Sequence, residues 1–470
     1  MLESKPTKSS FPENFMQILE TAAKILAQGE KTNSSVRNSF FRYFKKRNFE
    51  RKFYNSVYHF CMETIRRKNL LDEYLKISVD LKRLDPFVLS LFRIGTFISH
   101  DPSYQDNPLY SPKIIQKTIQ EIIQKIYDLD YAVLATKNLE RSFTATLTEL
   151  FENKDELERI ALEFYHPLWL VKYLVNVLGQ ESAISLLNAN NQPKTVYVRV
   201  NTLTTTRDKI IEELTDEEIP VEKDEVFSDL IKVKKGPLLE DGARHNVALS
   251  SAVKNGHLFI QGRASAAISH ILDPQPNEIV VDVAAAPGMK TSHICQLMNN
   301  QGKIIGIDVA DHRLKKLNEL ALKIGKRTIN IIQADSRFPP LRPEIADRLL
   351  IDAPCSSTGI LRMYPDHKWF DFSRVEAFSQ LQEEIILKTL PLLKPGGVGV
   401  YSVCSLMEQE GEKHLLKLKK QRGIKLVDPG CGNPGYQREI YKDLPCRRFF
   451  PHLHETDGFF IAKFEKVAEE

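Results

Sequence analysis

The sequence predicts an α/β protein in which a doubly wound, mostly parallel sheet follows a small α/β module and a helical region. Three observations predict this fold. From about residue 255 to the end, short apolar strands alternate with amphipathic helices, as in a parallel sheet covered by helices. Residues 194–233 follow a strand, helix, strand order. Residues 12–150 show only helix-spaced apolar positions.

The first predicted domain, residues 1–155, is helical. In the stretch "RKFYNSVYHFCMETIRRKNLLDEYL", Phe53, Val57, Phe60 and Ile65 recur at helix spacing, with charged residues on the other face. The stretches "DPFVLSLFRIGTFI" and "SPKIIQKTIQEIIQKIYDL" follow the same pattern, and the second begins with a Ser-Pro start signal. We therefore expect a bundle of helices.

The second predicted domain, residues 156–255, combines a helical linker with a small α/β module. "HPLWLVKYLVNVLG" has the pattern of a helix, "KTVYVRVN" is a β-branched and aromatic strand, "TRDKIIEELTDEE" is a helix and "DLIKV" is a second strand. The third predicted domain, residues 256–470, holds the doubly wound sheet. Its strands are "EIVVDV", "KIIGIDV", "INIIQAD", "RLLIDA" and "VGVYSV". In such sheets, ligands bind outside the carboxyl ends of the strands.

Composition excludes several classes of protein. The chain has 470 residues, of which 42% are hydrophobic and 27% charged, and no apolar run is long enough to cross a bilayer. The start of the chain lacks the layout of a secretory signal, so we expect a cytoplasmic protein. Its six cysteines form no C-x-x-C pair, and no histidines cluster at metal-ligand spacing. The sequence therefore predicts neither a disulfide framework nor a metal site.

Positive charge is concentrated near the N-terminus. Residues 1–70 carry 14 Lys and Arg against 6 Asp and Glu, and in "RYFKKRNFERKF" aromatic residues alternate with basic ones. Such a patch favours a polyanion, because neutralising phosphates releases counterions. The alternative is a solvated basic helix face. The run alone does not decide between these interpretations.

Acidic residues follow successive strands of the predicted sheet. The first strand leads into "VVDVAAAPGMKTSHI", whose small residues let the backbone turn tightly and approach a ligand. Asp308 ends the second strand and is placed to accept hydrogen bonds from ribose hydroxyls. Asp335 and Asp352 end the next two. This register predicts an adenosine-containing cofactor along the sheet edge; the alternative is that each Asp only caps its strand.

Two cysteines also lie at predicted strand ends, in "DAPC" and "YSVC". Carbon 5 of a cytosine is a poor nucleophile, but a thiolate that adds to carbon 6 makes carbon 5 able to attack an electrophilic methyl group. The carbon-5 proton must then be removed and the thiol expelled. Two thiols beside a carboxylate, Asp352, suit this chemistry. Either cysteine alone is more often a packing residue.

The motifs together resemble the Sun/Nop family of RNA cytosine-C5 methyltransferases. "VVDVAAAPGMKT", "DAPCSSTGILRMYPDHKW", "LLKPGGVGVYSVCSLMEQE" and "FFPHLHETDGFFIAKF" resemble the family's motifs in order within residues 165–468, and "RVNTL" resembles its small preceding module. Upstream, "FERKFYNSVYHFCMETIRRKNLLDEYL" and "LDPFVLSLFRIGTFI" resemble a NusB-like RNA-binding domain. The resemblance implies a Rossmann-like methyltransferase domain that uses S-adenosylmethionine.

The resemblance also implies residue roles. Cys404 matches the family's nucleophile and Cys355 the cysteine that assists product release, while Asp352 would contact the cytosine N3 edge and Lys290 would line the reaction site. The residues implied to hold S-adenosylmethionine are Ala284, Ala285, Ala286, Pro287, Gly288, Met289, Lys290, Asp308, Arg313, Asp335 and Asp352.

Five residues depart from the family pattern. Ala284 and Met289 stand where Cys and Gly are usual in the turn, and Val403 stands where Thr precedes the nucleophile. Ser357 replaces a Gly, and Gly262 replaces an Asp. These changes bear on rate and cofactor affinity, because none removes a catalytic atom.

The resemblance implies RNA as the partner, with ribosomal RNA of the small subunit first and tRNA as the alternative. A second hypothesis is an RNA-binding assembly protein with a weakened active site, and a third is methylation of uracil or of DNA cytosine by the same thiol chemistry. A base within a stem must be unstacked to reach Cys404, so a loop or junction is the expected target. The sequence leaves open the nucleotide, the protein partners and the oligomeric state.

Overall fold

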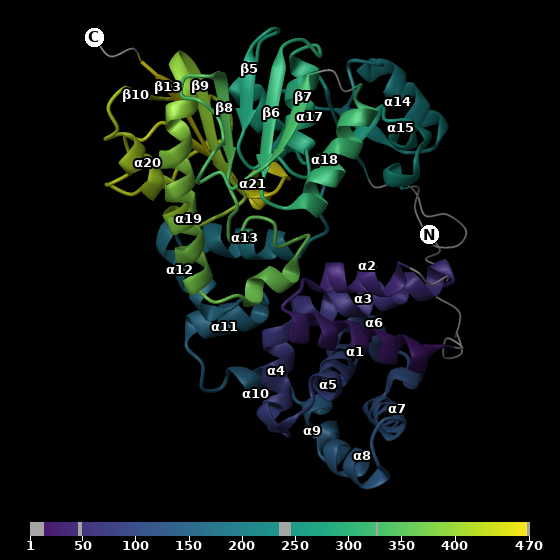
Figure 1. Cartoon of the computed structure of the whole chain (residues 1–470). Coiled ribbons are helices and arrows are strands. Elements are labelled where there is room, and N and C mark those ends of the chain that lie inside the picture. Colours follow the sequence, from purple (N-terminus) through teal and green to yellow (C-terminus); the bar gives the residue numbers. More distant parts are fainter. Residues whose placement is uncertain (1–13, 46–48, 235–245, 326–327, 468–470) are drawn as a thin grey trace, which may run out of the picture. The chain divides into compact units, whose positions relative to one another are not determined.

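The fold is described from a computed structural model of the chain, in residues 14–45, 49–234, 246–325 and 328–467. The chain divides into two compact units. The helical unit comprises Met1–Asn191 and Met363–Phe370, and the sheet unit comprises Gln192–Arg362 and Asp371–Glu470. Figure 1 labels their elements. In the described residues, no helix is both long enough and apolar enough to cross a bilayer.

The described part of the helical unit is built from helices, without strands. The four predicted apolar positions of α3 (Arg51–Arg66) are all buried, as the spacing predicts. The other elements are α1 (Phe15–Thr32), α2 (Val36–Phe44), α4 (Lys68–Lys76), η1 (Leu81–Arg83), α5 (Pro86–His100), α6 (Pro102–Gln105), η2 (Pro108–Tyr110), α7 (Pro112–Gln124), α8 (Leu129–Thr136), α9 (Leu139–Thr144), α10 (Leu147–Phe151), α11 (Glu156–Glu163), α12 (Leu168–Leu178) and α13 (Gln180–Asn191).

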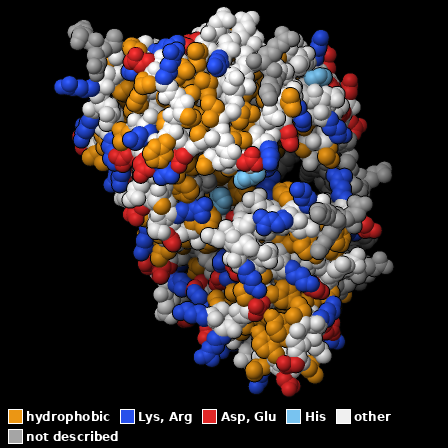
Figure 2. Space-filling view, viewed as in Figure 1, with side chains coloured by type: hydrophobic (Ala, Val, Ile, Leu, Met, Phe, Trp, Pro, Cys, Tyr) orange, Lys and Arg blue, Asp and Glu red, His pale blue; other side chains and the backbone are white. Residues whose placement is uncertain are grey.

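The basic run at residues 42–53 spans the end of α2 and the start of α3; its residues 46–48 lie outside the described parts. The side chains of Arg42, Lys45, Arg51 and Lys52 are exposed, whereas the aromatic side chains at 44 and 53 are buried in the helical core. Figure 2 shows basic and acidic side chains mixed over this face of the molecule. Two aromatic side chains of the run are thus used for packing, whereas Phe49 is 36% exposed, so the run offers exposed charge together with an exposed aromatic ring.

A short segment far along the chain completes the helical unit. It contains the 3-10 helix η4 (Pro365–Trp369). Lys368 is buried, and its ammonium donates to the carbonyl of Tyr165 at 3.1 Å and to Asn191 Oδ1 at 2.8 Å. The indole of Trp369 donates to the carbonyl of Ile65 at 2.7 Å. These buried hydrogen bonds fix the segment to the helices.

The sheet unit begins with a four-stranded antiparallel sheet in the order β2-β3-β1-β4. The sequence reading anticipated β1 and β3 but not the short β2 and β4. Its elements are β1 (Val196–Val200), α14 (Arg207–Asp216), β2 (Val221–Lys223), β3 (Leu230–Val233), η3 (Val247–Leu249), α15 (Ser251–Lys254) and β4 (Leu258–Ile260).

A nine-stranded sheet forms the rest of this unit. Its order is β11-β12-β13-β9-β8-β5-β6-β7, with β10 paired to β13. The strands β7, β6, β5, β8 and β9 are parallel, whereas β13 runs antiparallel to β9. The strands are β5 (Ile279–Asp282), β6 (Lys303–Asp308), β7 (Ile329–Gln333), β8 (Ala346–Asp352), β9 (Leu393–Val403), β10 (Ile424–Val427), β11 (Asn433–Pro434), β12 (Cys446–Phe449) and β13 (Phe459–Lys466).

Helices cover this sheet, which confirms the predicted doubly wound fold. α16 packs against β8, β9 and β13. α18 packs against β6 and β7, as Figure 1 shows. The chain order reverses between β5 and β8, the point where doubly wound sheets open a crevice for ligands. The helices are α16 (Arg263–Leu272), α17 (Met289–Leu297), α18 (Asp311–Lys323), α19 (Ser373–Thr389), η5 (Leu390–Leu392), η6 (Glu408–Glu410), α20 (Glu412–Leu418) and α21 (Pro451–His454).

Candidate active site

The ends of the parallel strands open onto one hollow with a volume of about 570 Å³. Small-molecule sites typically enclose roughly 300 to 1,000 Å³. Most of the residues predicted from the sequence line it: Ala284, Ala286, Pro287, Asp308, Arg313, Asp335, Asp352, Cys355 and Cys404. The topology therefore gathers side chains that are up to 120 positions apart in the chain.

The turn after β5 is shaped by small residues. Ala285 and Ala286 are buried and pack on α18. Gly288 has φ of 107°, and a Cβ atom there would lie 2.4 Å from Cδ1 of Leu317. Glycine is required at this position for both reasons, because a side chain would be strained and would collide. The backbone can thus pass close to a ligand before α17 begins.

Asp308 supports this turn from the end of β6. Its Oδ2 accepts from the backbone N–H of Ala286 at 3.2 Å, and its Oδ1 accepts from that of Ala310 at 3.0 Å. Arg313 lies 3.3 Å from the same carboxylate and also donates to the carbonyl of Ala286. The two side chains therefore hold the turn in place and face the hollow.

Asp335 follows β7, and its carboxylate is paired with Arg337. The guanidinium lies 2.7 Å from Oδ2, and these hydrogen bonds hold the pKa of Asp335 below its ordinary value. Arg337 lines the hollow as well, although the sequence reading did not single it out. Any group that Asp335 bound would share the carboxylate with this arginine.

Asp352, at the end of β8, is held on both sides. Lys290 Nζ lies 2.7 Å from its Oδ2, and the Ser402 hydroxyl donates to its Oδ1 at 2.7 Å. The Lys290 ammonium also lies 5.3 Å from the centre of the Phe459 ring, a cation–π contact. The carboxylate and the ammonium are thus both oriented, and the carboxylate remains partly exposed.

The two cysteines meet at the mouth of β8 and β9. Their Sγ atoms are 3.2 Å apart, and both thiols are free. Cys355 is 9% exposed and Cys404 is more accessible. The hydrogen bond from Cys404, then burial, then the charges of Cys404 and Glu410 raise the pKa of Cys355 well above its ordinary value. The neutral thiol is therefore the favoured form of Cys355, and both thiols line the hollow.

Asp282, which no sequence motif singled out, lies buried behind the turn. Its Oδ2 accepts from the Thr291 hydroxyl at 2.7 Å. Burial, with the negative charge of Asp352 nearby, raises the pKa of Asp282 to about 7. Two carboxyls close together, one buried and one in the hollow, give this region a group that titrates near neutrality.

Two of the departures from the family pattern lie outside the lining of the hollow. Val403 is fully buried at the end of β9 and pairs with Phe460 of β13. Met289 packs against the core beneath the sheet, and its carbonyl accepts from Arg199 Nη1 at 3.0 Å. The Met289 side chain therefore packs into the core and does not narrow the hollow.

Of the three other departures, Ala284 and Ser357 line the hollow and Gly262 does not. Ser357 has φ of 62°, a conformation that favours glycine, which accounts for the Gly usual there. Gly262 is the N-cap of α16 and has no side chain to cap it. The Thr456 hydroxyl instead accepts from the backbone N–H of Ala264 at 3.1 Å. A residue far along the chain thus supplies the missing cap.

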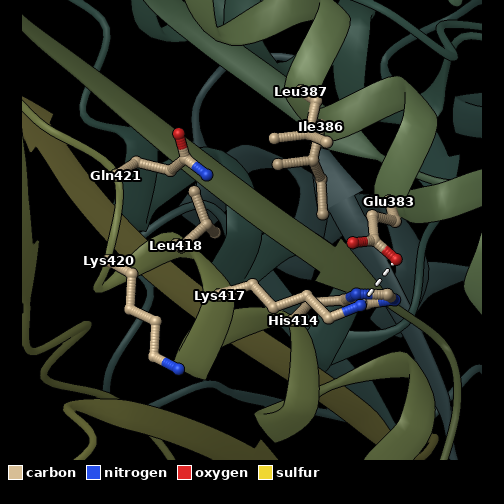
Figure 3. A pocket seen from close by; sticks show the side chains of 8 residues that line it. All are labelled: Glu383, Ile386, Leu387, His414, Lys417, Leu418, Lys420 and Gln421. Carbon is tan, nitrogen blue, oxygen red and sulfur yellow. Dashed lines mark hydrogen bonds and ion pairs between the residues drawn. The ribbon is translucent and has the colours of Figure 1, made fainter.

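A second, smaller hollow lies between α19 and α20 and is shown in Figure 3. Its volume is about 230 Å³. Lys417 lies 2.6 Å from Glu383, which pairs the one carboxylate of the lining with a cation. Its lining is Glu383, Ile386, Leu387, His414, Lys417, Leu418, Lys420 and Gln421, without a cysteine. This hollow carries none of the groups that the motifs predict.

Asp229, His270 and His293 form a cluster that the sequence spacing did not reveal. Their ligand atoms lie within 4.8 Å of one another, close enough to hold a metal ion. Each histidine Nε2 is, however, hydrogen-bonded to the Asp229 carboxylate, at 2.9 and 2.7 Å. Burial and the charge of Arg199 lower the pKa of His293 to about 3. The positive charge of Arg199 would repel a metal cation bound to this cluster. The absence of a metal site stays a prediction.

The chain is similar to known proteins over both parts of the sheet unit. Residues 269–465 match the family described as 16S rRNA methyltransferase RsmB/F, and residues 166–238 match the ferredoxin-like domain of RsmF/B-like methyltransferases. The chain is 29% identical to the probable ribosomal RNA small subunit methyltransferase B of Bacillus subtilis, over 86% of this chain and 88% of that protein. It is 32% identical to ribosomal RNA small subunit methyltransferase B of Pectobacterium carotovorum, over 64% of this chain and 67% of that protein.

A tRNA methyltransferase and two solved structures are also similar to this chain. The tRNA (cytosine(72)-C(5))-methyltransferase of Pyrococcus horikoshii is 36% identical over 46% of this chain and 54% of that protein. The crystal structure of PH0851 superposes with a TM-score of 0.81 at 28% identity, covering 98% of this chain and all of that one. NSun6 from Pyrococcus horikoshii with SFG, an analogue of S-adenosylmethionine, has a TM-score of 0.57 at 26% identity and covers 64% of this chain and 99% of that one.

The fold and the groups at its strand ends define a Rossmann-like methyltransferase that depends on S-adenosylmethionine. More specifically, the chain belongs to the 16S rRNA methyltransferase RsmB/F family, which confirms the resemblance indicated by its motifs.

Proposed function

We propose that this chain methylates carbon 5 of a cytosine in small-subunit ribosomal RNA, with Cys404 as the nucleophile and Cys355 as the group that assists product release. The observation that carries this proposal is the pair of thiols 3.2 Å apart in the same hollow as Asp352, whose carboxylate pairs with Lys290. A single activated thiol would serve for addition alone, whereas the complete reaction also needs help to expel that thiol.

The residues present fit S-adenosylmethionine. The turn at residues 284–290 lets the backbone approach a ligand, because a Cβ atom at Gly288 would fill the close contact with α18. Asp308 is anchored by two backbone N–H groups and keeps lone pairs free for ribose hydroxyls. We assign Arg313 and Asp335 to the same ligand, as the lining of one hollow. When bound there, S-adenosylmethionine supplies an electrophilic methyl group.

The chain's own residues prepare the cytosine. Cys404 loses its proton to solvent and its Sγ forms a bond to carbon 6, so that the electron pair of the C5–C6 double bond moves toward carbon 5. Asp352 binds the N3 edge, and Lys290 orients that carboxylate from 2.7 Å. Carbon 5 would take the methyl group, and the electron pair of the broken sulfur–methyl bond would stay on the cofactor's sulfur. The proton of carbon 5 then passes to water, and the C–H electron pair restores the C5–C6 double bond. The bond from Sγ to carbon 6 breaks with assistance from the adjacent Cys355 thiol, and its electron pair returns to Cys404 as thiolate.

The share of this chain that each relative matches favours ribosomal RNA as the substrate. The Bacillus subtilis protein matches 86% of this chain, which requires the helical unit as well as the sheet unit, whereas the Pyrococcus tRNA enzyme matches 46%. The exposed basic residues of α2 and α3 supply charge for phosphates. A tRNA cytosine remains the second candidate. A ribosomal RNA substrate would place the protein in the cytoplasm.

We also propose the three-part division: a NusB-like RNA-binding domain in residues 1–155, a linker with the small α/β module in 156–255, and the methyltransferase domain in 256–470. The helices of the first part and the nine-stranded sheet of the third support this division. An RNA-binding protein with a weakened site is less well supported, because Val403 and Met289 do not line the hollow.

Labelled S-adenosylmethionine with separate pools of ribosomal RNA and tRNA tests the function. The proteins are wild type, Cys404→Ala, Cys355→Ala and, as a matched control, Cys431→Ala, which changes another partly exposed cysteine outside the hollow. Nucleosides are digested and identified. Wild type and Cys431→Ala should make 5-methylcytidine in ribosomal RNA, Cys404→Ala should make none, and Cys355→Ala should accumulate a covalent protein–RNA adduct.

Each contrary result has a definite meaning. Product in the tRNA pool alone would overturn the substrate, and full activity of Cys404→Ala would overturn the nucleophile. Binding of RNA by a wild type that makes no methylated nucleoside in either pool would favour the assembly-protein alternative.

A further inference from the structure

A buried carboxylate joins the two segments that carry the cysteines. Glu410, the last residue of η6, has 0% of its surface exposed. Its Oε1 accepts from the backbone N–H of Ser356 at 2.8 Å and from Gln382 Nε2 at 2.9 Å. Its Oε2 accepts from the hydroxyls of Ser356 and Ser405. These two serines directly follow Cys355 and Cys404, so one side chain is bonded to both cysteine segments.

Further hydrogen bonds close the same connection. The hydroxyls of Thr358 and Ser405 are 3.1 Å apart, and the backbone N–H of Leu406 donates to Thr358 Oγ1 at 2.9 Å. The backbone N–H of Gly359 donates to the carbonyl of Cys404 at 3.0 Å. Glu410 is the charged member of this network, and its four hydrogen bonds all converge on its two oxygens. The spacing of the cysteines therefore depends on groups outside the hollow.

The carboxylate is balanced by hydrogen-bond donors instead of by a cation. Among the ion pairs of the described residues, Glu410 has none, while the neighbouring Arg448 pairs with Glu412 at 2.6 Å. A buried carboxylate without a cationic partner carries a large desolvation cost unless its hydrogen bonds are complete. Glu410 meets that condition, and its negative charge acts on the Cys355 thiol.

We propose that Glu410 is a positioning residue that holds Cys355 beside the attacking Cys404 and places a buried negative charge next to the Cys355 segment. This inference rests on the proposed function of the two cysteines and extends it to a residue that touches neither substrate nor cofactor. The hydrogen bond from Cys404, burial, and the charges of Cys404 and Glu410 together raise the pKa of Cys355, so the charge of Glu410 favours the neutral form of this thiol.

The rate of Cys355 alkylation tests the effect of the Glu410 charge on this thiol in the absence of RNA. The background is Cys404→Ala, which leaves Cys355 as the thiol of interest, and the variants add Glu410→Gln or, as the matched control, Glu408→Gln. Glu408 lies on the same 3-10 turn but pairs with Arg438 at 2.7 Å. The glutamine at 410 can keep the hydrogen bonds, because its amide can donate to serine hydroxyls. The rate of reaction with iodoacetamide is followed by peptide mass spectrometry across pH.

The expected result is a shift of the Cys355 alkylation midpoint to lower pH by about one unit in the Glu410→Gln protein. The Glu408→Gln protein should match its background. Equal midpoints in all three proteins would overturn the electrostatic part of the proposal.

A proximity assay tests the positioning part with both cysteines present. Diamide oxidises two adjacent thiols to a disulfide and is itself reduced, taking up the two protons and two electrons. Glu410→Ala breaks the connection and should slow formation of the 355–404 disulfide by about tenfold, the size expected for losing one net hydrogen bond. Glu408→Ala should react like wild type, and melting curves verify that both variants are folded.

Unchanged disulfide formation in folded Glu410→Ala would overturn the positioning role. If Glu410→Ala does not fold, Glu410→Gln is carried through the same assay, where its retained hydrogen bonds predict a rate no slower than wild type and a tenfold loss would contradict the geometry. These readouts use neither RNA nor S-adenosylmethionine. They separate failure of this inference from failure of the proposed function, which is decided by the nucleoside assay.

Discussion

The Lys290 ammonium lies 2.7 Å from Oδ2 of Asp352, although the two residues are 62 positions apart. Lys290 stands in the first turn of α17, and Asp352 ends β8. These elements flank the place where the chain order of the sheet reverses. The Ser402 hydroxyl fixes the other carboxylate oxygen at 2.7 Å. The start of α17 and the end of β9 therefore both contact a single carboxylate at the end of β8.

Replacing this carboxylate should stop the reaction more than it harms the fold. We expect Asp352→Asn to lower kcat/KM for methylation by about a hundred- to ten-thousand-fold, because the group that handles the N3 edge is lost. Steady-state methylation of ribosomal RNA measures the effect. Asp347→Asn is the matched control, since Asp347 lies at the opposite end of β8 and also pairs with a lysine, Lys394, at 2.6 Å. Equal losses in both variants would contradict a role in the reaction.

The small module should control cofactor affinity through Arg199. This fully buried guanidinium donates to the carbonyl of Met289 at 3.0 Å and to the Ser292 hydroxyl at 2.9 Å. Burial lowers its pKa to about 9. We expect Arg199→Met to reduce the free energy of unfolding by about 1 to 3 kcal/mol, because two buried acceptors lose their donor. Affinity for S-adenosylmethionine should fall as the start of α17 loosens.

Urea unfolding and calorimetric titration with S-adenosylmethionine measure the two effects. Arg207→Met is the control, since Arg207 donates within the module, to the carbonyls of Asp224 and Phe227. It should lose stability without losing cofactor affinity. The same loss of affinity in both variants would show that Arg199 acts only through general stability.

Much of the fold could be predicted because its signals are local. Apolar residues at helix spacing marked the buried face of α3, and short apolar runs marked the parallel strands. The turn after β5 and the Asp at the end of β6 stand at sequence positions that a doubly wound sheet brings to one edge. For that reason, the motifs predict that Asp308, Asp352 and the two cysteines lie at the same end of the sheet.

The rest depended on contacts between distant residues. The pairing of Asp335 with Arg337 is local but ambiguous in sequence, whereas the Glu410 connection joins positions 54 residues apart. The antiparallel β13 inserts beside β9 late in the chain, a register that no short pattern encodes. Thr456 caps a helix that begins nearly two hundred residues earlier, so the sequence around Gly262 alone suggests that this helix lacks a capping side chain.

The stability of the protein should fall in mild acid partly because of His414. Burial lowers the pKa of His414 to about 4, below the ordinary value of 6.5. Between these pH values the unfolded chain binds a proton at this residue that the folded chain does not. The free energy of unfolding therefore falls as pH drops from 6.5 to 4, by at most about 1.4 kcal/mol per pH unit from this group.

Urea unfolding at several pH values tests this contribution. His414→Gln should flatten the slope between pH 4 and 6.5 and leave more of the stability at pH 4.5 than wild type retains. His312→Gln, an exposed substitution on α18, controls for the loss of a histidine. An unchanged slope in His414→Gln would mean that other buried groups cause the acid sensitivity.

The Thr456 hydroxyl should be worth about 1 kcal/mol to the fold as the remote cap of α16. Thr456→Val keeps the shape of the side chain but leaves the backbone N–H of Ala264 without its acceptor. Adding Gly262→Asn should restore most of the loss, because an Asn at the N-cap can accept from the same N–H. A Cβ at 262 would lie 3.3 Å from Asp457 Oδ2, so this carboxylate, which pairs with Lys194, must shift by a few tenths of an ångström to admit it. Gly262→Asn alone should gain little, since the cap is already supplied. Chemical unfolding of the four proteins gives the double-mutant cycle, and a double variant no more stable than Thr456→Val would contradict the substitution of one cap for the other.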